Sequence, residues 1–199
     1  NITVDIPDTT YPDNATATVT VTGATGVINI TVDGKVFNGT VTNGVANVDL
    51  TGLSAGSSKV ATVNFTSTDG YNLNATASVK FNVNKANSTI VIDVEKVYVY
   101  NDNIIINLTA TGSSGAINVT INGKVYPINY NKQVVVETIA AGEYTIIATL
   151  AGNENYTAAT NSTTFKVKQA ATSVAIGVGA VYYVGDDIEI TLTTAYSIS

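Results

Sequence analysis

The chain has 199 residues, nine lysines against fifteen acidic residues, a formal net charge of -6, and no cysteine, histidine or tryptophan. This composition excludes disulfides, a Ser/His/Asp relay, a Cys/His pair and the common zinc sites. The negative charge opposes a phosphate backbone, so we expect no nucleic-acid partner.

The first repeat is predicted to span residues 1–85 and to contain seven short strands. Apolar residues alternate at Ile2, Val4 and Ile6, and Pro7 ends the pairing because proline cannot donate to a ladder. Residues 15–21 alternate Ala or Val with Thr, the pattern of a strand with one buried face. Turn and loop signals separate the remaining alternating segments, which lie at residues 26–32, 36–41, 45–50, 60–65 and 75–83.

The sequence of one hairpin of this repeat occurs a second time in the chain. The segment GVINITVDGKVF at residues 26–37 returns as GAINVTINGKVY at residues 115–126. Each copy turns at a two-residue Asp-Gly or Asn-Gly, which favours the φ > 0 geometry of a tight antiparallel hairpin. The spacing of 89 residues between Gly34 and Gly123 suits one compact β-domain per copy.

A second repeat, predicted at residues 86–169, follows the same strand order, and residues 170–199 supply the first two strands of a third. The third repeat matches the second at an offset of 84 residues, which pairs Val174 with Ile90 and Leu192 with Leu108. Two strands bury too little apolar area to be stable alone, so the third repeat needs further strands from this or a neighbouring chain. We predict an all-β chain of tandem immunoglobulin-like β-sandwich domains, with about seven antiparallel strands each.

The segment AGEYTIIATLAGNENYTAATNSTTFKVK at residues 141–168, together with INVTINGKVY, resembles the bacterial Ig-like repeats of the group-3 type. Such repeats occur in tandem in large adhesin-like surface proteins, those of methanogenic archaea among them. The first repeat departs from the pattern, with TDGYN where the second has GNENY. The resemblance implies non-catalytic structural or spacer repeats of an extracellular adhesin-like protein, which form a rod, coat or fibre on the cell surface.

The partners that this resemblance implies are neighbouring repeats or subunits of the same surface assembly, and cell-wall or host glycans. No apolar run approaches the length of a membrane span, so we expect no direct membrane insertion in this segment. The chain opens in a strand at Ile2, without the layout of a signal peptide. We therefore interpret it as a segment of a longer exported protein.

Acceptor triplets for N-glycosylation are the strongest signal beyond the architecture. N-x-T occurs eleven times, where chance pairing of the 22 asparagines with threonine predicts about four. A strand face rich in Asn and Thr raises that number without any modification, because positions i and i+2 share a face. We predict that several of these asparagines carry glycans: Asn1, Asn14, Asn29, Asn38, Asn64, Asn74, Asn87, Asn107, Asn118, Asn155 and Asn161.

Asp13, Asp102 and Asp186 recur at the turn that follows the first strand of each repeat. They are weak candidates for a Ca²⁺ site, which needs six to eight oxygen ligands that these single carboxylates do not supply. The favoured interpretation is that each aspartate accepts backbone hydrogen bonds in its turn. We expect no other cofactor.

Enzymatic chemistry finds little support, and we predict no catalytic residue. Paired carboxylates occur at Asp186-Asp187 and at Asp93 with Glu95, but strands of a repeat place such pairs on solvated faces. Tyrosines cluster at Tyr98, Tyr100, Tyr182 and Tyr183, and Tyr71 and Tyr156 share the late loop. Sugar stacking is one interpretation of these rings; packing at strand ends with corner-type hydrogen bonds is the favoured one.

Two alternatives to the spacer hypothesis stay open. The two strands of the third repeat expose pairing edges, so the chain is alternatively a filament subunit that polymerises by strand exchange. A carbohydrate-binding module is the other alternative. The sequence alone does not separate the three.

Overall fold

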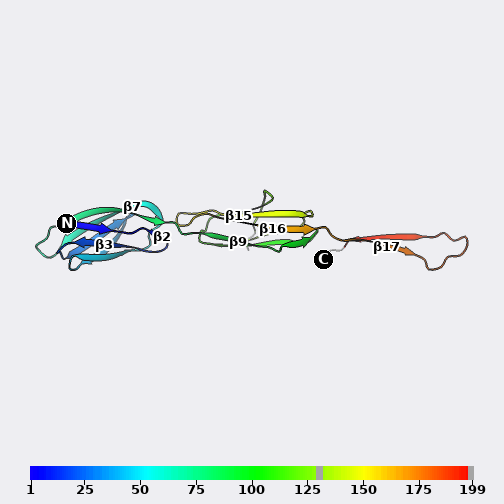
Figure 1. Ribbon diagram of the computed structural model, residues 1–199, viewed down its shortest axis with the longest axis horizontal. Helices are drawn as coiled ribbons and strands as arrows, with labels where there is room; N and C mark the ends of the chain where they lie inside the picture. Colours follow the sequence, from blue (N-terminus) through cyan, green and yellow to red (C-terminus); the bar gives the residue numbers. More distant parts are fainter. Residues whose placement is uncertain (129–131, 197–199) are drawn as a thin grey trace. The chain divides into compact units, whose positions relative to one another are not determined.

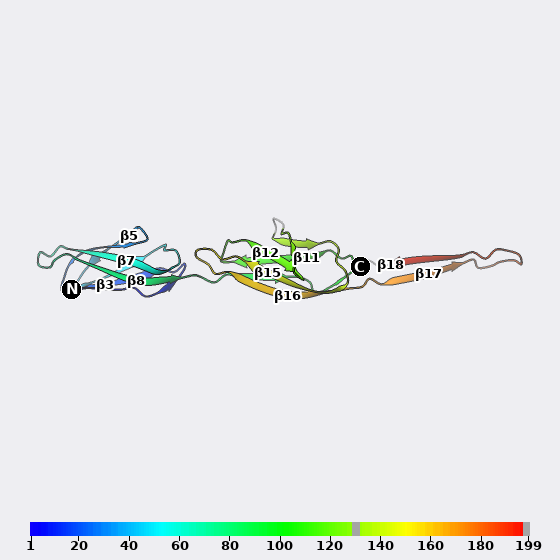
Figure 2. The same ribbon diagram turned by 90° about the horizontal axis from the view of Figure 1, so that it is seen from above.

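The computed structural model describes residues 1–128 and 132–196, so the last three positions of the predicted third repeat lie outside the described residues. Over the described part the chain forms strands and no helix, hence no helix that could cross a membrane. The prediction of an all-β chain is confirmed (Figures 1 and 2).

The first sandwich consists of two sheets. One is three-stranded, in the order β1-β3-β6, and contains β1 (Ile2–Asp5), β3 (Ala15–Val21) and β6 (Val45–Leu50). The other is five-stranded, in the order β2-β8-β7-β4-β5, and contains β2 (Thr9–Thr10), β4 (Gly26–Val32), β5 (Lys35–Val41), β7 (Gly56–Ser67) and β8 (Ala75–Asn84). The chain crosses between the sheets after β1, β2, β3, β5 and β6, as in an immunoglobulin-like sandwich.

The period-2 patterning of the strands builds the core of this sandwich. Along β3 the alanines and valines are buried, while the intervening threonines are exposed or half-buried. The core joins such alternate residues from both sheets, with Val19 and Val48 from one and Ile28, Ile30, Val63 and Phe65 from the other. Phe65 is the largest fully buried side chain, and Phe/Trp→Ala changes at such sites cost about 3–5 kcal/mol.

The duplicated hairpin forms as its turn residues predict. Asp33 and Gly34 have φ of 48° and 77°, and Asn122 and Gly123 have φ of 46° and 81°. Residues with φ > 0 at both central positions define the turn whose twist matches two antiparallel strands. The predicted Asn43-Gly44 turn has the same geometry, with φ of 52° and 85°.

The second sandwich repeats the arrangement. Its three-stranded sheet, in the order β14-β11-β9, contains β9 (Thr89–Asp93), β11 (Ile104–Thr111) and β14 (Gln133–Val136). Its five-stranded sheet, in the order β10-β16-β15-β12-β13, contains β10 (Val97–Val99), β12 (Ile117–Ile121), β13 (Lys124–Tyr126), β15 (Gly142–Leu150) and β16 (Ala159–Lys168). Buried residues from both sheets, such as Ile106, Val134, Ile146 and Phe165, make its core.

After the second sandwich the chain forms a two-stranded sheet. β17 (Thr172–Val178) pairs antiparallel with β18 (Ile190–Tyr196), with Ile176 opposite Leu192. Ile176 and Leu192 are 68% and 65% exposed. Leu108, which matches Leu192 in the second repeat, is 5% exposed.

Spatial contacts divide the chain into two compact units. Unit 1 contains Asn1–Thr89, Thr111–Ala116 and Leu150–Ala159; unit 2 contains Ile90–Ala110, Ile117–Thr149 and Thr160–Ser199. The strands of the three predicted repeats fall within 1–85, 86–169 and 170–199, but the boundaries themselves stay predictions.

The structure adds elements that the sequence pattern did not predict. β2 and β10 are two or three residues long and pair parallel with the last strand of their sandwich, β8 and β16. Each belongs to a segment in which the chain leaves one sheet and joins the other. β7 also begins earlier than predicted, at Gly56, with an irregular register between Gly56 and Lys59.

Candidate functional site

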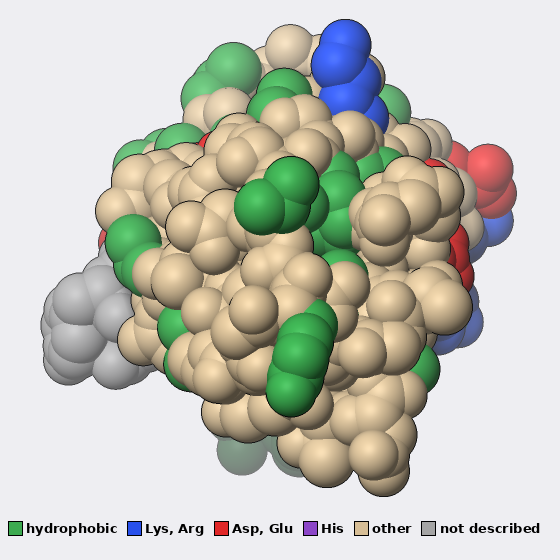
Figure 3. All heavy atoms as spheres, turned by 90° about the vertical axis from the view of Figure 1, so that its left-hand side faces the viewer, with side chains coloured by type: hydrophobic (Ala, Val, Ile, Leu, Met, Phe, Trp, Pro, Cys, Tyr) green, Lys and Arg blue, Asp and Glu red, His purple; other side chains and the backbone are tan. Residues whose placement is uncertain are grey.

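The predicted glycan acceptors lie mostly at the surface. Nine of the eleven asparagines are exposed, and Asn107 and Asn155 are half-buried. The Asn155 side-chain oxygen accepts a hydrogen bond from the amide of Ala55, 2.8 Å away within unit 1. Figure 3 shows one face of the molecule, on which backbone and uncharged polar side chains dominate and charged side chains are few.

Three acceptors of the first sandwich form one row across its five-stranded sheet. Asn29 on β4 lies opposite Asn38 on β5 and opposite Asn64 on β7. Thr76 extends the row on β8 and donates a hydrogen bond to the Asn64 side-chain oxygen at 3.1 Å. The outward face of this sheet therefore presents the Asn-Thr surface that the triplets predict.

Two of the three recurring aspartates accept backbone hydrogen bonds within their turns. The Asp102 carboxylate accepts a hydrogen bond from the amide of Val99 at 2.6 Å, and Asp186 accepts one from Tyr183 at 2.7 Å. Asp13 is exposed, and its amide donates to the carbonyl of Thr10. The turn interpretation is confirmed for Asp102 and Asp186. In the described part of the chain, no group of three or more metal-ligating side chains includes any of these aspartates.

The tyrosines divide into packed and exposed rings. Tyr98 is buried, and its ring packs edge-on against Phe165 with centroids 5.8 Å apart. Its hydroxyl accepts a hydrogen bond from the amide of Glu95 at 3.2 Å, and Tyr182 makes the matching bond with the amide of Gly179 at 2.8 Å. The corner-type prediction is therefore confirmed for these two. Tyr71 is 94% exposed, so packing was the wrong prediction for this residue, because its loop projects the ring into solvent.

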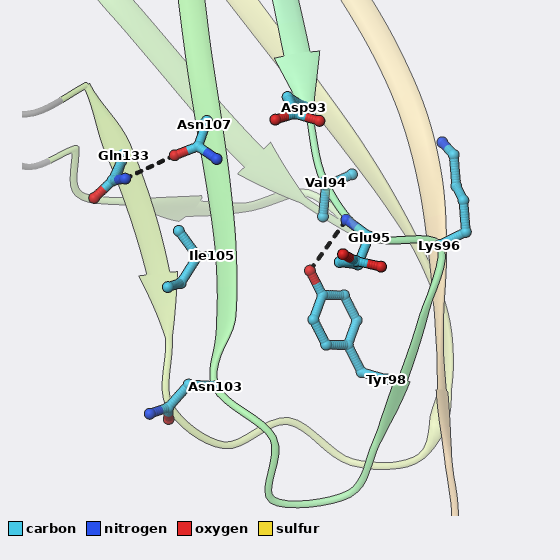
Figure 4. A pocket seen from close by; sticks show the side chains of 9 residues that line it. All are labelled: Asp93, Val94, Glu95, Lys96, Tyr98, Asn103, Ile105, Asn107 and Gln133. Carbon is cyan, nitrogen blue, oxygen red and sulfur yellow. Dashed lines mark hydrogen bonds between the residues drawn. The ribbon is translucent and has the colours of Figure 1, made fainter.

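One concavity of unit 2 is a groove of about 620 Å³, shown in Figure 4. It lies where the chain leaves β9 and crosses to β10, beside the outward face of β11 and β14. We call this site the groove, and it is lined by Asp93, Val94, Glu95, Lys96, Tyr98, Asn103, Ile105, Asn107 and Gln133.

Tyr98 forms the inner wall of the groove. Burial raises the pKa of its hydroxyl above the ordinary tyrosine value, and the negative charges of Glu95, Asp93 and Asp102 act in the same direction. The amide of Glu95, which donates to the hydroxyl oxygen, opposes the shift. Tyr98 therefore stays a neutral phenol at physiological pH, and we assign it a positioning role for the Glu95 backbone.

Asn107 and Gln133 lie side by side on paired strands at the other wall. The Gln133 side-chain nitrogen donates to the Asn107 side-chain oxygen at 2.7 Å. This bond fixes which end of the Asn107 amide points away from Gln133. In Figure 4 the Asn107 nitrogen lies on the side of the groove where Asp93 and Val94 are found.

The crossing segment of the first sandwich begins at Ile6. Ile6 ends the alternating run of the first strand, as Val94 does in the second repeat, and it is 5% exposed within the core cluster. Asp8 then ties the crossing segment to β8, because its carboxylate accepts from the amide and side-chain nitrogen of Asn82 at 2.7 and 2.8 Å. These bonds lower the pKa of Asp8.

Sequence reasoning missed the groove, although it singled out several of its residues. It interpreted Asp93 and Glu95 as a solvated face; both side chains are exposed, and they also line the groove. The signal that could have found the site is the clustering of three charged residues, Asp93, Glu95 and Lys96, where the chain leaves the first strand of the second repeat. Chemically the groove offers hydrogen-bonding groups beside two aliphatic side chains, which suits a ligand that is polar and partly apolar.

No protein-family model and no curated protein sequence matches the chain. Among solved structures, the fibronectin(III)-like modules of CbhA from Clostridium thermocellum are 16% identical, with 85% of this chain and 95% of that chain covered and a TM-score of 0.36. The immunoglobulin domains 1–5 of Sidekick-1 are 9% identical, with 98% of this chain and 45% of that chain covered and a TM-score of 0.39. At such TM-scores these likenesses add nothing to the strand order, which itself defines Ig-like β-sandwich domains.

Proposed function

We propose that the chain is a non-catalytic spacer of Ig-like repeats in an extracellular, adhesin-like surface protein of the group-3 type. The observation that carries the proposal is the outward surface of the sandwiches. Alternate strand positions bury Val and Ile, and the positions between them present Asn and Thr in acceptor triplets, nine of whose asparagines are exposed. Glycans at such positions solubilise a surface that carries few charges.

Immunogold labelling of intact source cells tests this function. An antibody raised against the folded chain is expected to label the outside of the envelope without permeabilisation. Labelling that requires permeabilisation would contradict the extracellular assignment. A chain of the same composition with scrambled sequence, used to absorb the antiserum, controls for binding to the low-complexity surface.

The two-stranded sheet β17–β18 favours a second candidate, a filament subunit that exchanges strands. Val174, Ile176, Ile190 and Leu192 are 61–68% exposed, whereas Ile90, Ile106 and Leu108, the second-repeat matches of three of them, are at most 5% exposed. Exposed edges without charge or proline promote pairing with another chain. Electron microscopy of the purified chain is expected to show regular filaments in this case, and Leu192→Lys to abolish them. A monodisperse monomer at high concentration would exclude the filament-subunit function.

A further inference from the structure

Asn107 is the acceptor asparagine among the residues that line the groove. Its triplet is complete within one strand, because Thr109 lies two positions along β11 and is exposed on the same outward face. Asn107 itself is half-buried, whereas Asn118, the acceptor on β12, is exposed. Asn107 and Asn118 therefore differ in surroundings, although both lie on strands of the same sandwich.

The side chain of Asn107 is oriented before any sugar is attached. Its oxygen accepts from Gln133 at 2.7 Å, which directs the amide nitrogen to the side where Asp93 and Val94 lie (Figure 4). The amide nitrogen is the atom that carries an N-linked sugar. A glycan attached here keeps the bond to Gln133, because N-glycosylation leaves the amide oxygen free to accept it.

The lining of the groove fits a neutral polyol better than an anion. Asp93 and Glu95 are negative, and Lys96 directs its ammonium group away to Thr163 on β16, at 2.6 Å. An anion therefore meets two carboxylates, while sugar hydroxyls donate to them. Ile105, 45% exposed, and half-buried Val94 offer apolar contact to the C–H face of a ring. The volume of about 620 Å³ lies within the ~300–1,000 Å³ of small-molecule pockets.

Among the three repeats, only the second has an acceptor asparagine at this position. Asn107 matches Thr18 in the first repeat and Thr191 in the third. In the first repeat Thr18 instead donates to Asn47 at 3.0 Å on the outer face. The acceptor therefore belongs to the repeat in which the groove is found.

From these observations we infer that Asn107 carries an N-linked glycan whose first sugar, a hexose or N-acetylhexosamine, lies in the groove. This inference rests on the proposed extracellular function. The donor is a sugar linked through phosphate to a polyprenyl lipid and delivered by an oligosaccharyltransferase. The Asn107 Nδ2–C1 bond forms, the C1–O bond to phosphate breaks, and one amide proton leaves with the lipid phosphate.

The first sugar, bound in the groove, covers the segment in which the chain crosses from β9 to β10. It gives the exposed Glu95 and Asp93 hydroxyl partners and shields the loop from Val94 to Lys96 from water. Amide exchange in a loop slows when opening must break additional hydrogen bonds. One ordinary bond corresponds to roughly fivefold slower exchange.

The test compares two matched variants of protein purified from its native, glycosylating host. Thr109→Val removes the triplet of Asn107 without touching its bond to Gln133, and Thr120→Val removes the triplet of Asn118. Peptide-resolved mass spectrometry gives the sugar at each site, and hydrogen–deuterium exchange follows residues 93–98. We expect sugar on Asn107 in the unaltered chain, exchange about fivefold faster in Thr109→Val, and no change in Thr120→Val.

A baseline comes from the same proteins made in a host without N-glycosylation, where both variants are expected to exchange like the unaltered chain. Faster exchange of Thr109→Val in that baseline would show a packing effect of the substitution and overturn the inference. Sugar on other acceptors with Asn107 bare overturns the inference and leaves the proposed function standing. Sugar on Asn107 with unchanged exchange also overturns it. The absence of sugar from every acceptor would overturn both the inference on Asn107 and the proposed function.

Discussion

The two sandwiches share their strand order and differ where the chain crosses between sheets. In the first, Ile6 is buried in the core, and Asp8 fastens the crossing segment to Asn82 on β8. In the second, half-buried Val94 stands in place of Ile6, Tyr98 is buried, and the groove lies at the surface beside the crossing segment. Two repeats can therefore share a framework while their crossing segments are held by different contacts.

The largest effect is expected from changing Ile6 in the first sandwich. Ile6→Glu removes a buried aliphatic side chain and forces a carboxylate toward the core, so we expect a loss of about 3 kcal/mol in the free energy of unfolding. Glu95→Ile, in the crossing segment of the second sandwich, replaces an exposed side chain and is expected to change stability by less than about 0.5 kcal/mol. Urea denaturation measures both, and equal effects of the two changes would refute the contrast.

Tyr98→Phe tests the support behind the groove. The ring and its contact with Phe165 remain, but the Glu95 amide loses the hydroxyl acceptor, so we expect a loss of about 1 kcal/mol. Tyr100→Phe is the matched control, because Tyr100 is 39% exposed. Thermal unfolding of both variants measures the difference, and an equal effect in the control would remove the positioning role of Tyr98.

Two loops of unit 1 allow a comparison by pH. The Asp69 carboxylate accepts from the amides of Thr25, Tyr71 and Asn72, and these bonds lower its pKa well below the usual value. In the other loop the neutral Asn153 accepts from the amides of Asn155 and Tyr156.

Because the folded-state pKa of Asp69 is depressed, its stabilising contribution is present above the unfolded pKa of about 3.9 and is lost as the pH falls through the folded value. NMR titration should show the Tyr71 and Asn72 amide signals moving only in strong acid and the Asn155 and Tyr156 signals not moving with them. Asp69→Asn should abolish the transition. A midpoint at the ordinary aspartate pKa would contradict the account.

The smallest effect is expected at Tyr71. Its ring is 94% exposed, so Tyr71→Ala should change the free energy of unfolding by less than about 0.5 kcal/mol. Tyr156→Ala provides the comparison, since Tyr156 is half-buried and packs edge-on against Tyr11 with centroids 5.4 Å apart. Denaturant titration of the pair checks the difference; a clear loss for Tyr71→Ala would show a packing partner for this ring.

Much of the framework could be predicted because its causes are local. Alternation along β3 and the Asp33-Gly34 turn specify strand faces and hairpin geometry from neighbouring residues alone. The crossing segments could not be predicted, since β2 and β10 are too short to show a period and depend on a parallel partner far along the chain. The duplicated Gly26 is explained only by structure: a Cβ there would clash with the Thr66 carbonyl and the Phe65 ring.

Several residues of the candidate site could be predicted from the sequence, but their arrangement in space could not. The sequence identifies Asn107 as an acceptor and Asp93 with Glu95 as a carboxylate pair, but a linear pattern does not show that the three line one hollow. Gln133 had no signal at all, because its role is to orient Asn107 across a strand pair.

Intact-mass measurement of the protein purified from its native cell surface tests the central claim most directly. The account predicts a mass above the 20.6 kDa of these residues by repeated sugar increments, after allowance for any further chain. It also predicts that the increments map to exposed acceptors of both sandwiches. Native protein whose eleven acceptor asparagines are all unmodified would contradict it.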